Sequence, residues 1–288
     1  MTKNSLLWQI TPKGGGPTSY LFGTMHVRDA RAFGWLDTAL RYLTDCEVFA
    51  TEFDFSETDD QALAAVLRLP EGTSLHQLLK PSAWKNLDHY ALKRLGIPAA
   101  RFDHQHPMMV STTLTAVFMS EEAPFSLDET LWHAAQAAGK RCTGVETFAE
   151  QLQTLQKIPL EQHVKGLTWL LKNFGRQRRR LQKMMNMYAE SDLQRLYQAA
   201  KKDAKGLRKI LLYDRNALMT KRFVEIARSQ SLFCAVGAGH LAGQKGMLRL
   251  LKKEGFKVSP RPPPPTALAP AGGRRMGGGV RGGGHGGG

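Results

Sequence analysis

Residues 232–240 read LFCAVGAGH, a run of five apolar residues that ends in Gly-Ala-Gly-His. An apolar run rich in β-forming residues and closed by glycine predicts a buried strand that stops at Gly237. In open α/β sheets, ligands bind at the carboxyl ends of the strands. A glycine there lets the backbone turn sharply and lets a ligand approach closely. We therefore expect His240 to project into a crevice and not into the core.

The same pattern occurs a second time, near the start of the chain. Residues 20–26 read YLFGTMH, so His26 follows a predicted strand with the same Gly-x-x-His spacing as His240. If the two strands are neighbours, the two histidines share one site. Two unrelated histidines at strand ends are the alternative reading of the spacing.

Two glutamates also end apolar strands. Glu52 follows the run Val48–Ala50, and Glu146 ends a predicted strand over residues 141–145. Two His and one or two Glu are a ligand set suited to Mn²⁺, Co²⁺ or Zn²⁺. Such an ion polarises a carbonyl and activates water, and a second carboxylate can act as general base. For Glu146, capping of a helix that begins near Thr147 is the alternative.

The remaining pattern predicts an α/β fold with a mixed central sheet, flanking helices and a mainly helical insertion. Residues 1–258 form the predicted domain, with the insertion at about 150–230. Ser126 and Glu129 have the spacing of a capping box, and we interpret Asp128 between them as part of that helix start. Further strands are predicted over 6–10, 46–53 and 256–258, and further helices over 34–43, 126–138 and 241–253.

The formal charge of +15 first suggests a nucleic acid or an anionic membrane as partner. The charge is unevenly distributed, because residues 1–164 are net −5, residues 165–258 are net +16 and residues 259–288 are net +4. The half with His26, Glu52 and Glu146 is thus acidic, in keeping with a cation site. The run Arg178–Arg180 is interpreted as a solvated helix face.

Residues 259–288 contain 11 Gly and 6 Pro, a composition that predicts a disordered tail. Its Arg-Gly-Gly at 281–283 is typical of RNA-binding segments, but the chain offers no base-stacking platform beside it. Nucleic acid is therefore not the expected partner.

No run approaches the roughly 20 apolar residues of a membrane span, and no secretory signal is visible. The three cysteines, Cys46, Cys142 and Cys234, are widely spaced and lie beside apolar residues. We interpret them as buried free thiols of a reducing compartment, which predicts a cytoplasmic location.

Several stretches resemble the TraB/PrgY/GumN family. The resemblance extends in order and spacing from about Ser5 to Val258. It is carried by LWQI at 7–10, SYLFGTMHV at 19–27, TEFD at 51–54, SLD at 126–128, GVET at 144–147, DRN at 214–216 and AVGAGHL at 235–241.

This family is marked by two Gly-x-x-His motifs, a glutamate and an arginine, which the resemblance places at His26, His240, Glu52 and Arg215. The animal Tiki proteins, similar in these motifs, are membrane-tethered metalloproteases that depend on Mn²⁺ or Co²⁺, and the bacterial PrgY is implicated in shutting down a peptide pheromone. The resemblance thus implies His26, His240 and Glu52 as ligands of a divalent ion, with Mn²⁺ or Co²⁺ favoured. It implies a catalytic role for Glu52 and for Arg215, the last steadying negative charge, whereas the catalytic role expected for Glu146 follows from its place at a strand end.

The expected function is a metal-dependent hydrolase that acts on peptides through the two Gly-x-x-His motifs. A protein that binds a peptide or pheromone without cutting it is the first alternative. An RNA-associated protein that works through the basic helices and the Arg/Gly tail is the second. The sequence leaves the oligomeric state open.

Overall fold

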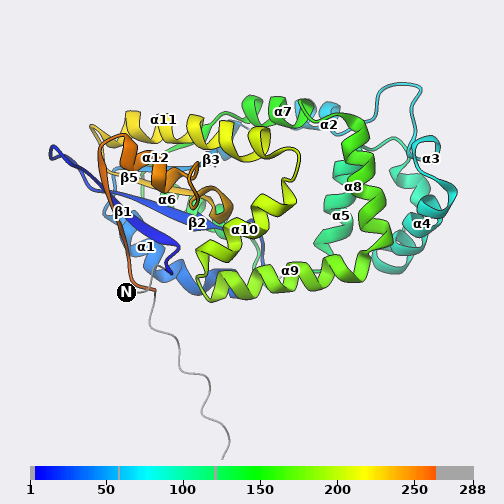
Figure 1. Cartoon of the computed structure of the whole chain (residues 1–288), viewed down its shortest axis with the longest axis horizontal. Helices are drawn as coiled ribbons and strands as arrows, with labels where there is room; N and C mark the ends of the chain where they lie inside the picture. The colour runs from blue at the N-terminus through cyan, green and yellow to red at the C-terminus, as the bar shows by residue number, and fades with distance from the viewer. Residues whose placement is uncertain (1–3, 58, 120–121, 264–288) are drawn as a thin grey trace, which may run out of the picture.

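A six-stranded mixed sheet forms the centre of the computed structural model, which describes residues 4–57, 59–119 and 122–263 (Figure 1). The strand order is β4-β3-β5-β2-β1-β6. β2, β5, β3 and β4 are mutually parallel, and β1 is antiparallel to both of its neighbours. The strands are β1 (Leu7–Pro12), β2 (Ser19–Thr24), β3 (Val48–Phe53), β4 (Arg141–Glu146), β5 (Leu232–Gly237) and β6 (Phe256–Pro260).

The run at 232–237 is the inner strand that the sequence predicts. β5 lies between β3 and β2 and is buried from Leu232 to Val236. A strand buried on both faces reads as a continuous apolar run, which explains why LFCAV shows no alternation of apolar and polar residues. The position of β5 brings the ends of β2 and β3 to either side of Gly237.

Helices cover both faces of this sheet. α1 and α6 pack on each other near β3, whereas α11 and α12 pack on each other near β4, β5 and β6 (Figure 1). The helices near the sheet are α1 (Leu36–Thr44), α6 (Leu127–Ala137), α7 (Phe148–Gln156), α9 (Phe174–Ala189), α10 (Leu193–Asp203), α11 (Arg215–Ala227) and α12 (Met247–Lys253). Shorter 3-10 turns are η1 (Ala30–Trp35), η2 (Phe55–Glu57), η3 (Ala99–Phe102) and η5 (Ala238–His240), and η4 (Lys209–Asp214) is a π-helical turn that leads into α11.

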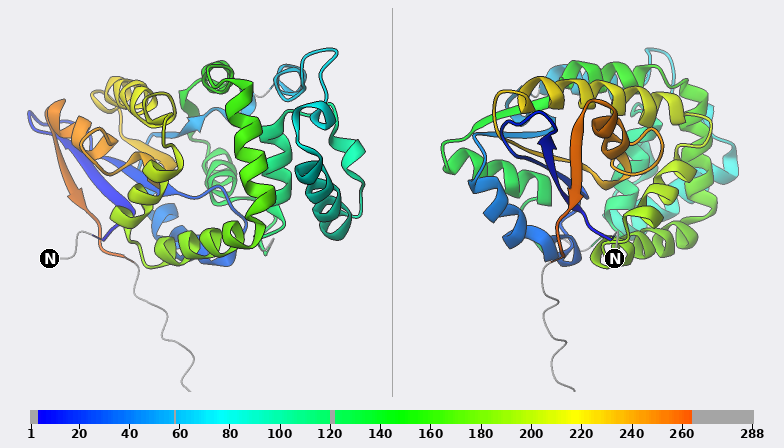
Figure 2. Two further views of the ribbon diagram at one scale, coloured as in Figure 1. Left: turned by 45° about the vertical axis from the view of Figure 1, so that its right-hand side comes forward. Right: turned by 60° about the vertical axis from the view of Figure 1, so that its left-hand side comes forward.

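A second hydrophobic cluster lies away from the sheet. It includes Leu87, Val110, Leu114 and Leu167, which come from helices on both sides of β4 in the sequence. Its helices are α3 (Leu75–Leu78), α4 (Pro81–Leu95), α5 (Pro107–Ala116) and α8 (Leu160–Lys172), with α2 (Asp60–Val66) nearby (Figures 1 and 2). Helices α2 to α6 precede β4, and α7 to α11 lie in the region of the helical insertion predicted over about 150–230.

Local signals are confirmed at several places. The strands predicted on either side of residues 12–17 form a hairpin of β1 and β2, with Trp8 opposite Leu21. Ser126 caps α6, and Glu129 completes the capping box. Of the three free cysteines, Cys46 and Cys234 are buried as expected, whereas Cys142 is only half-buried.

Two predicted boundaries are wrong. The helix expected from Leu241 begins at Met247, because Gly243 has a φ of +91° and ends the turn after η5 in the left-handed region. The last strand continues to Pro260, where Trp8 of β1 pairs with it. The tail predicted from Ser259 thus begins inside β6, and its residues 264–288 lie outside the described residues.

Candidate functional site

The candidate site lies at one edge of the sheet, where four parallel strands end. β2 leads into His26, β5 leads into His240, and Glu52 and Glu146 lie at the ends of β3 and β4. In register, Thr24 is opposite Gly237, and Phe53 is opposite Glu146. The four residues named from the sequence therefore come to the same edge, as parallel strands require.

Both histidines face one carboxylate oxygen. Glu52 Oε1 lies 3.8 Å from His26 Nε2 and 3.7 Å from His240 Nε2. The backbone N–H of Gly237 donates to the same Oε1 at 2.8 Å. A Cβ at Gly237 would lie 3.1 Å from Oε1, so the glycine leaves room for the carboxylate to reach the backbone.

His26 is oriented from behind by Asp128. Its Nδ1 lies 2.9 Å from Asp128 Oδ2, and the Asp128 carboxylate also accepts a hydrogen bond from the Thr24 hydroxyl. The Asp128 side chain is 1% exposed, whereas that of His26 is 55% exposed. The buried Asp128 charge raises the pKa of His26 well above its usual value, against the opposing effect of desolvation. His26 is thus a solvent-facing imidazole with a fixed ring orientation.

His240 is held by an amide in place of a carboxylate. Its Nδ1 lies 2.7 Å from Asn216 Oδ1, while Asn216 Nδ2 donates to the backbone carbonyl of Lys245 at 2.7 Å. Because that amide oxygen can only accept, Nδ1 of His240 carries the proton and Nε2 presents its lone pair to Glu52. Burial lowers the pKa of His240 to about 4, so this imidazole is neutral at pH 7.

Arg215 links the two glutamates. Its Nη2 contacts Glu52 Oε2 at 2.6 Å and also Glu146 Oε2, and its Nε donates to Glu146 Oε1 at 2.9 Å. The Glu146 side chain is 1% exposed and that of Arg215 is 17% exposed. Burial alone would raise the pKa of Glu52, but His240, His26 and Arg215 hold that pKa well below its usual range. Glu52 is therefore ionised.

Glu146 does not cap the helix that follows it. Thr147 caps α7 and forms a capping box with Glu150, so the helix start is served without Glu146. The Glu146 carboxylate accepts from Arg215 and from Gln151 Nε2 at 3.3 Å. Its contacts are those of a group that positions Arg215.

Two residues of this site escaped the sequence reasoning. Asp128 follows a capping-box serine, which made a purely structural role sufficient, and Asn216 is a single amide in a helical pattern. The available signal for Asp128 was that Ser126 and Glu129 already satisfy the helix start, which leaves Asp128 without a role there. Asn216 directly follows the motif arginine, but nothing in its own spacing singles it out.

Another histidine, His106, lies at the start of α5. His106 Nδ1 accepts from the N–H of Met108 and so caps α5, and its ring packs edge-on against His163. The His106 imidazole thus serves the start of α5.

The donor atoms at the sheet edge fit a divalent cation in type. Each histidine has Nδ1 occupied by an oxygen acceptor, which leaves Nε2 as the metal-facing nitrogen, as in carboxylate–histidine–metal sites. Nevertheless, no group of three or more His, Cys, Asp or Glu side chains in the described part of the chain is arranged to hold a metal ion. Both oxygens of Glu52 already accept hydrogen bonds, although each carboxylate oxygen keeps a second lone pair.

A cavity of about 480 Å³ opens beside His26. Its size is within the range of small-molecule and peptide side-chain pockets. Its wall is mostly apolar. Besides His26, the lining residues are Val27, Phe53, Phe55, Ala116 and Met119, together with Arg28, Ser126 and Glu129. An apolar group placed here would lie next to the histidine that solvent reaches.

The chain is similar to known proteins over most of its length. The TraB/PrgY/gumN family model matches residues 6–260. The chain is 24% identical over 323 residues to metalloprotease TIKI2 of Danio rerio, and 24% identical over 319 residues to metalloprotease TIKI1 of Homo sapiens. Each alignment covers 90% of this chain, but only 61% and 62% of the respective relative. The chain thus spans about three fifths of the length of these relatives.

No solved structure matches the chain. Within the described residues, the helices are too short or too polar to cross a membrane.

Proposed function

The chain belongs to the TraB/PrgY/gumN family, and we propose that it is a metal-dependent hydrolase that cleaves peptide bonds at the sheet edge. One observation carries the proposal. Asp128 and Asn216 occupy Nδ1 of His26 and His240, so that both Nε2 atoms face Glu52 Oε1 at 3.8 and 3.7 Å. A histidine that serves only packing needs its own two nitrogens to be satisfied. It does not need a second histidine to face the same carboxylate oxygen.

His26, His240 and Glu52 are the residues that would hold the ion, with Mn²⁺ or Co²⁺ favoured. His240 brings a neutral imidazole that needs no proton loss at pH 7. His26 would have to give up the proton that Asp128 favours. When bound, a divalent cation supplies polarisation of the substrate carbonyl and a lowered pKa of water.

Arg215 and Glu146 act together. Glu146 fixes the guanidinium through Nε and Nη2, and Nη1 is the part of Arg215 that donates to no group in the described residues. Nη1 is therefore available to a developing negative charge on the substrate. Glu52 is ionised beside both imidazoles and can orient attacking water as a hydrogen-bond acceptor, while its lowered pKa makes it a weak base. We assign Glu146 as a positioning residue for Arg215.

A peptide is the proposed substrate class. The relatives are named metalloproteases, and the 480 Å³ cavity beside His26 offers an apolar wall for one side chain of an extended peptide. Phe53 and Met119 are the members of that wall that would contact such a side chain.

The test compares two double variants. His26→Ala/His240→Ala removes the two Nε2 atoms, and His89→Ala/His104→Ala removes two exposed histidines from the helical part as a matched control. Both proteins and the wild type are loaded with Mn²⁺, their bound metal is measured by plasma mass spectrometry, and a peptide library is analysed by mass spectrometry for new termini. We expect bound metal and hydrolysis to vanish only in the first variant.

Unchanged metal content in His26→Ala/His240→Ala would overturn the proposal. If the wild type retains its metal and binds peptides without cleaving them, the peptide-binding alternative is established instead.

A further inference from the structure

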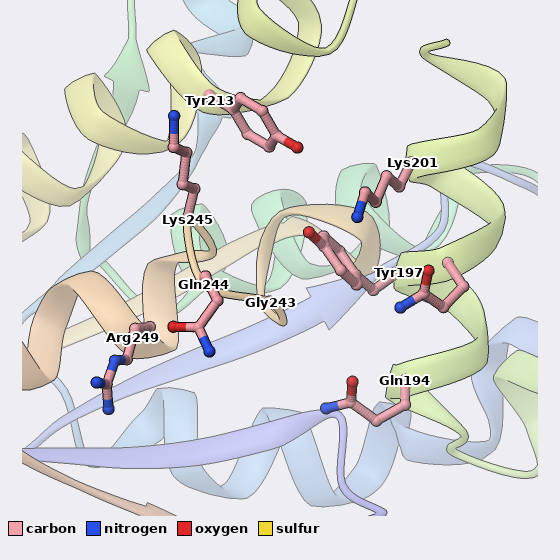
Figure 3. Close-up of a pocket in the computed structure, with 9 residues that line it drawn as sticks. Gln194, Tyr197, Lys201, Tyr213, Gly243, Gln244, Lys245 and Arg249 are labelled. Carbon is pink, nitrogen blue, oxygen red and sulfur yellow. The ribbon is translucent and has the colours of Figure 1, made fainter.

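A second cavity, larger than the one beside His26, lies between α10, η4 and the turn that precedes α12 (Figure 3). Its volume is about 660 Å³, a size that accommodates a small organic ligand. None of its lining residues belongs to the candidate site. They are Gln194, Tyr197, Gln198, Lys201, Tyr213, Gly243, Gln244, Lys245 and Arg249.

The charge of this cavity is entirely positive. Lys201, Lys245 and Arg249 line it, and no Asp or Glu does. Among the residues that the structure describes, no carboxylate pairs with any of these three side chains, and Lys245 Nζ lies 4.7 Å above the ring of Tyr213. Three cations that line one concave surface without counter-charges favour an anion there.

Gly243 forms part of the cavity wall. A Cβ at Gly243 would lie 2.3 Å from the Tyr197 ring, and the φ of +91° is one that other residues rarely adopt. The turn closes through the N–H of Gly246, which donates to the Gly243 carbonyl at 3.2 Å. This close approach presses the turn onto α10 and places Gln244 and Lys245 at the rim, opposite Lys201 (Figure 3).

Neutral donors complete the lining. The amides of Gln194, Gln198 and Gln244 and the hydroxyl of Tyr197 line the same space. Amide N–H and hydroxyl groups bind phosphate oxygens, and lysine and arginine neutralise their charge. One cation is enough to neutralise a single carboxylate. A phosphate group with two or more negative charges is neutralised better by several cations.

We propose that this cavity binds a small organic phosphate through Lys201, Lys245 and Arg249. The site is separate from the candidate hydrolytic site, and the proposal does not depend on hydrolysis. The two sites are adjacent in the fold, because the carbonyl of Lys245 accepts from Asn216, and Asn216 holds His240.

Isothermal titration of the full chain with inorganic pyrophosphate tests the proposal, with citrate as the carboxylate counterpart. We expect saturable binding of pyrophosphate to the wild type and weaker binding of citrate. Lys201→Gln/Arg249→Gln should weaken pyrophosphate binding by about tenfold or more, because each charged contact contributes roughly this much. Within the described residues, neither side chain forms a hydrogen bond or an ion pair, and the backbone contacts of both residues are kept in the variant.

Arg178→Gln/Arg179→Gln is the matched control, because it removes two exposed positive charges from α9. It should bind pyrophosphate like the wild type, and all three proteins should show the same urea midpoint. Absence of saturable binding to the wild type would overturn the proposal, and so would an equal loss in both double variants. Tighter binding of citrate than of pyrophosphate would reject phosphate as the ligand class.

Discussion

Asp128 Oδ2 lies 2.9 Å from His26 Nδ1, which joins the first turn of α6 to the loop after β2. The aspartate is buried and the imidazole faces solvent. A residue that the sequence assigns to a helix start is therefore the group that orients the first motif histidine and sets its charge.

Asp128→Asn should lower the pKa of His26 toward its usual value, because the Asp128 charge is the main cause that raises it. Titration of the metal-free protein by NMR of the imidazole protons measures this change. Asp37→Asn, which removes an exposed carboxylate on α1, should leave the His26 pKa unchanged. A His26 pKa that stays high in Asp128→Asn would show that Glu52 is its dominant partner.

Asn216→Ala should weaken metal binding by about 10- to 100-fold, the usual effect of removing a group that orients a ligand histidine. The variant leaves His240 Nδ1 without its acceptor and frees the ring to rotate. Competition with a chelating dye measures the affinity for Mn²⁺. Asn186→Ala, at an exposed residue whose side-chain oxygen accepts from Arg31, is the control and should bind like the wild type. Equal affinities in both variants would exclude a role for Asn216 at the metal.

Arg215→Ala should destabilise the fold by about 3–5 kcal/mol, because it leaves two buried carboxylates without their shared cation. Urea denaturation measures the free energy of unfolding. Arg195→Ala breaks an exposed pair with Glu190 and should cost about 0–1 kcal/mol. A loss in Arg215→Ala as small as that in Arg195→Ala would mean that Glu52 and Glu146 take up protons instead.

Arg222→Gln should change how stability depends on pH. The Arg222 guanidinium, which donates to Glu150, lowers the pKa of Glu150 to about 2. A carboxyl with a lowered pKa in the fold contributes stability above about pH 4.5, its value when unfolded, and loses that contribution as the pH falls toward 2. The difference in urea midpoint between wild type and variant should therefore be constant from pH 7 to 5 and shrink between pH 4.5 and 2. If the difference in urea midpoint does not vary with pH, Arg222 stabilises the fold through packing and not through its charge.

Much of the fold follows from local signals. The apolar run at 232–236 predicts an inner strand, Ser126 and Glu129 predict the start of α6, and the two Gly-x-x-His motifs predict turns at the sheet edge. These signals work because each one depends on neighbours within a few residues. The start of α12 was misjudged because Gly243 is spaced like a residue within a helix, and only its contact with Tyr197 of α10 shows that the chain must turn there.

The site is only partly visible in the sequence for the same reason. His26, Glu52 and His240 end strands, so their placement follows from the rule for parallel sheets. Their partners come from α6 and α11, and no spacing relates Asp128 to His26 or Asn216 to His240. Glu146 pairs with Arg215 and does not cap α7. This contact likewise depends on the packing of α11 beside β4.

The place of β5 has a consequence for how the protein is made. During synthesis, His26 and Glu52 leave the ribosome long before residues 232–240, yet the strand that must lie between them is β5. A nascent chain that has emerged only as far as Gln230 has β2 and β3 without their common neighbour, and it has neither Gly237 nor His240 beside Glu52. Any activity that requires these groups together is thus withheld until residues 232–240 have emerged and β5 has joined the sheet.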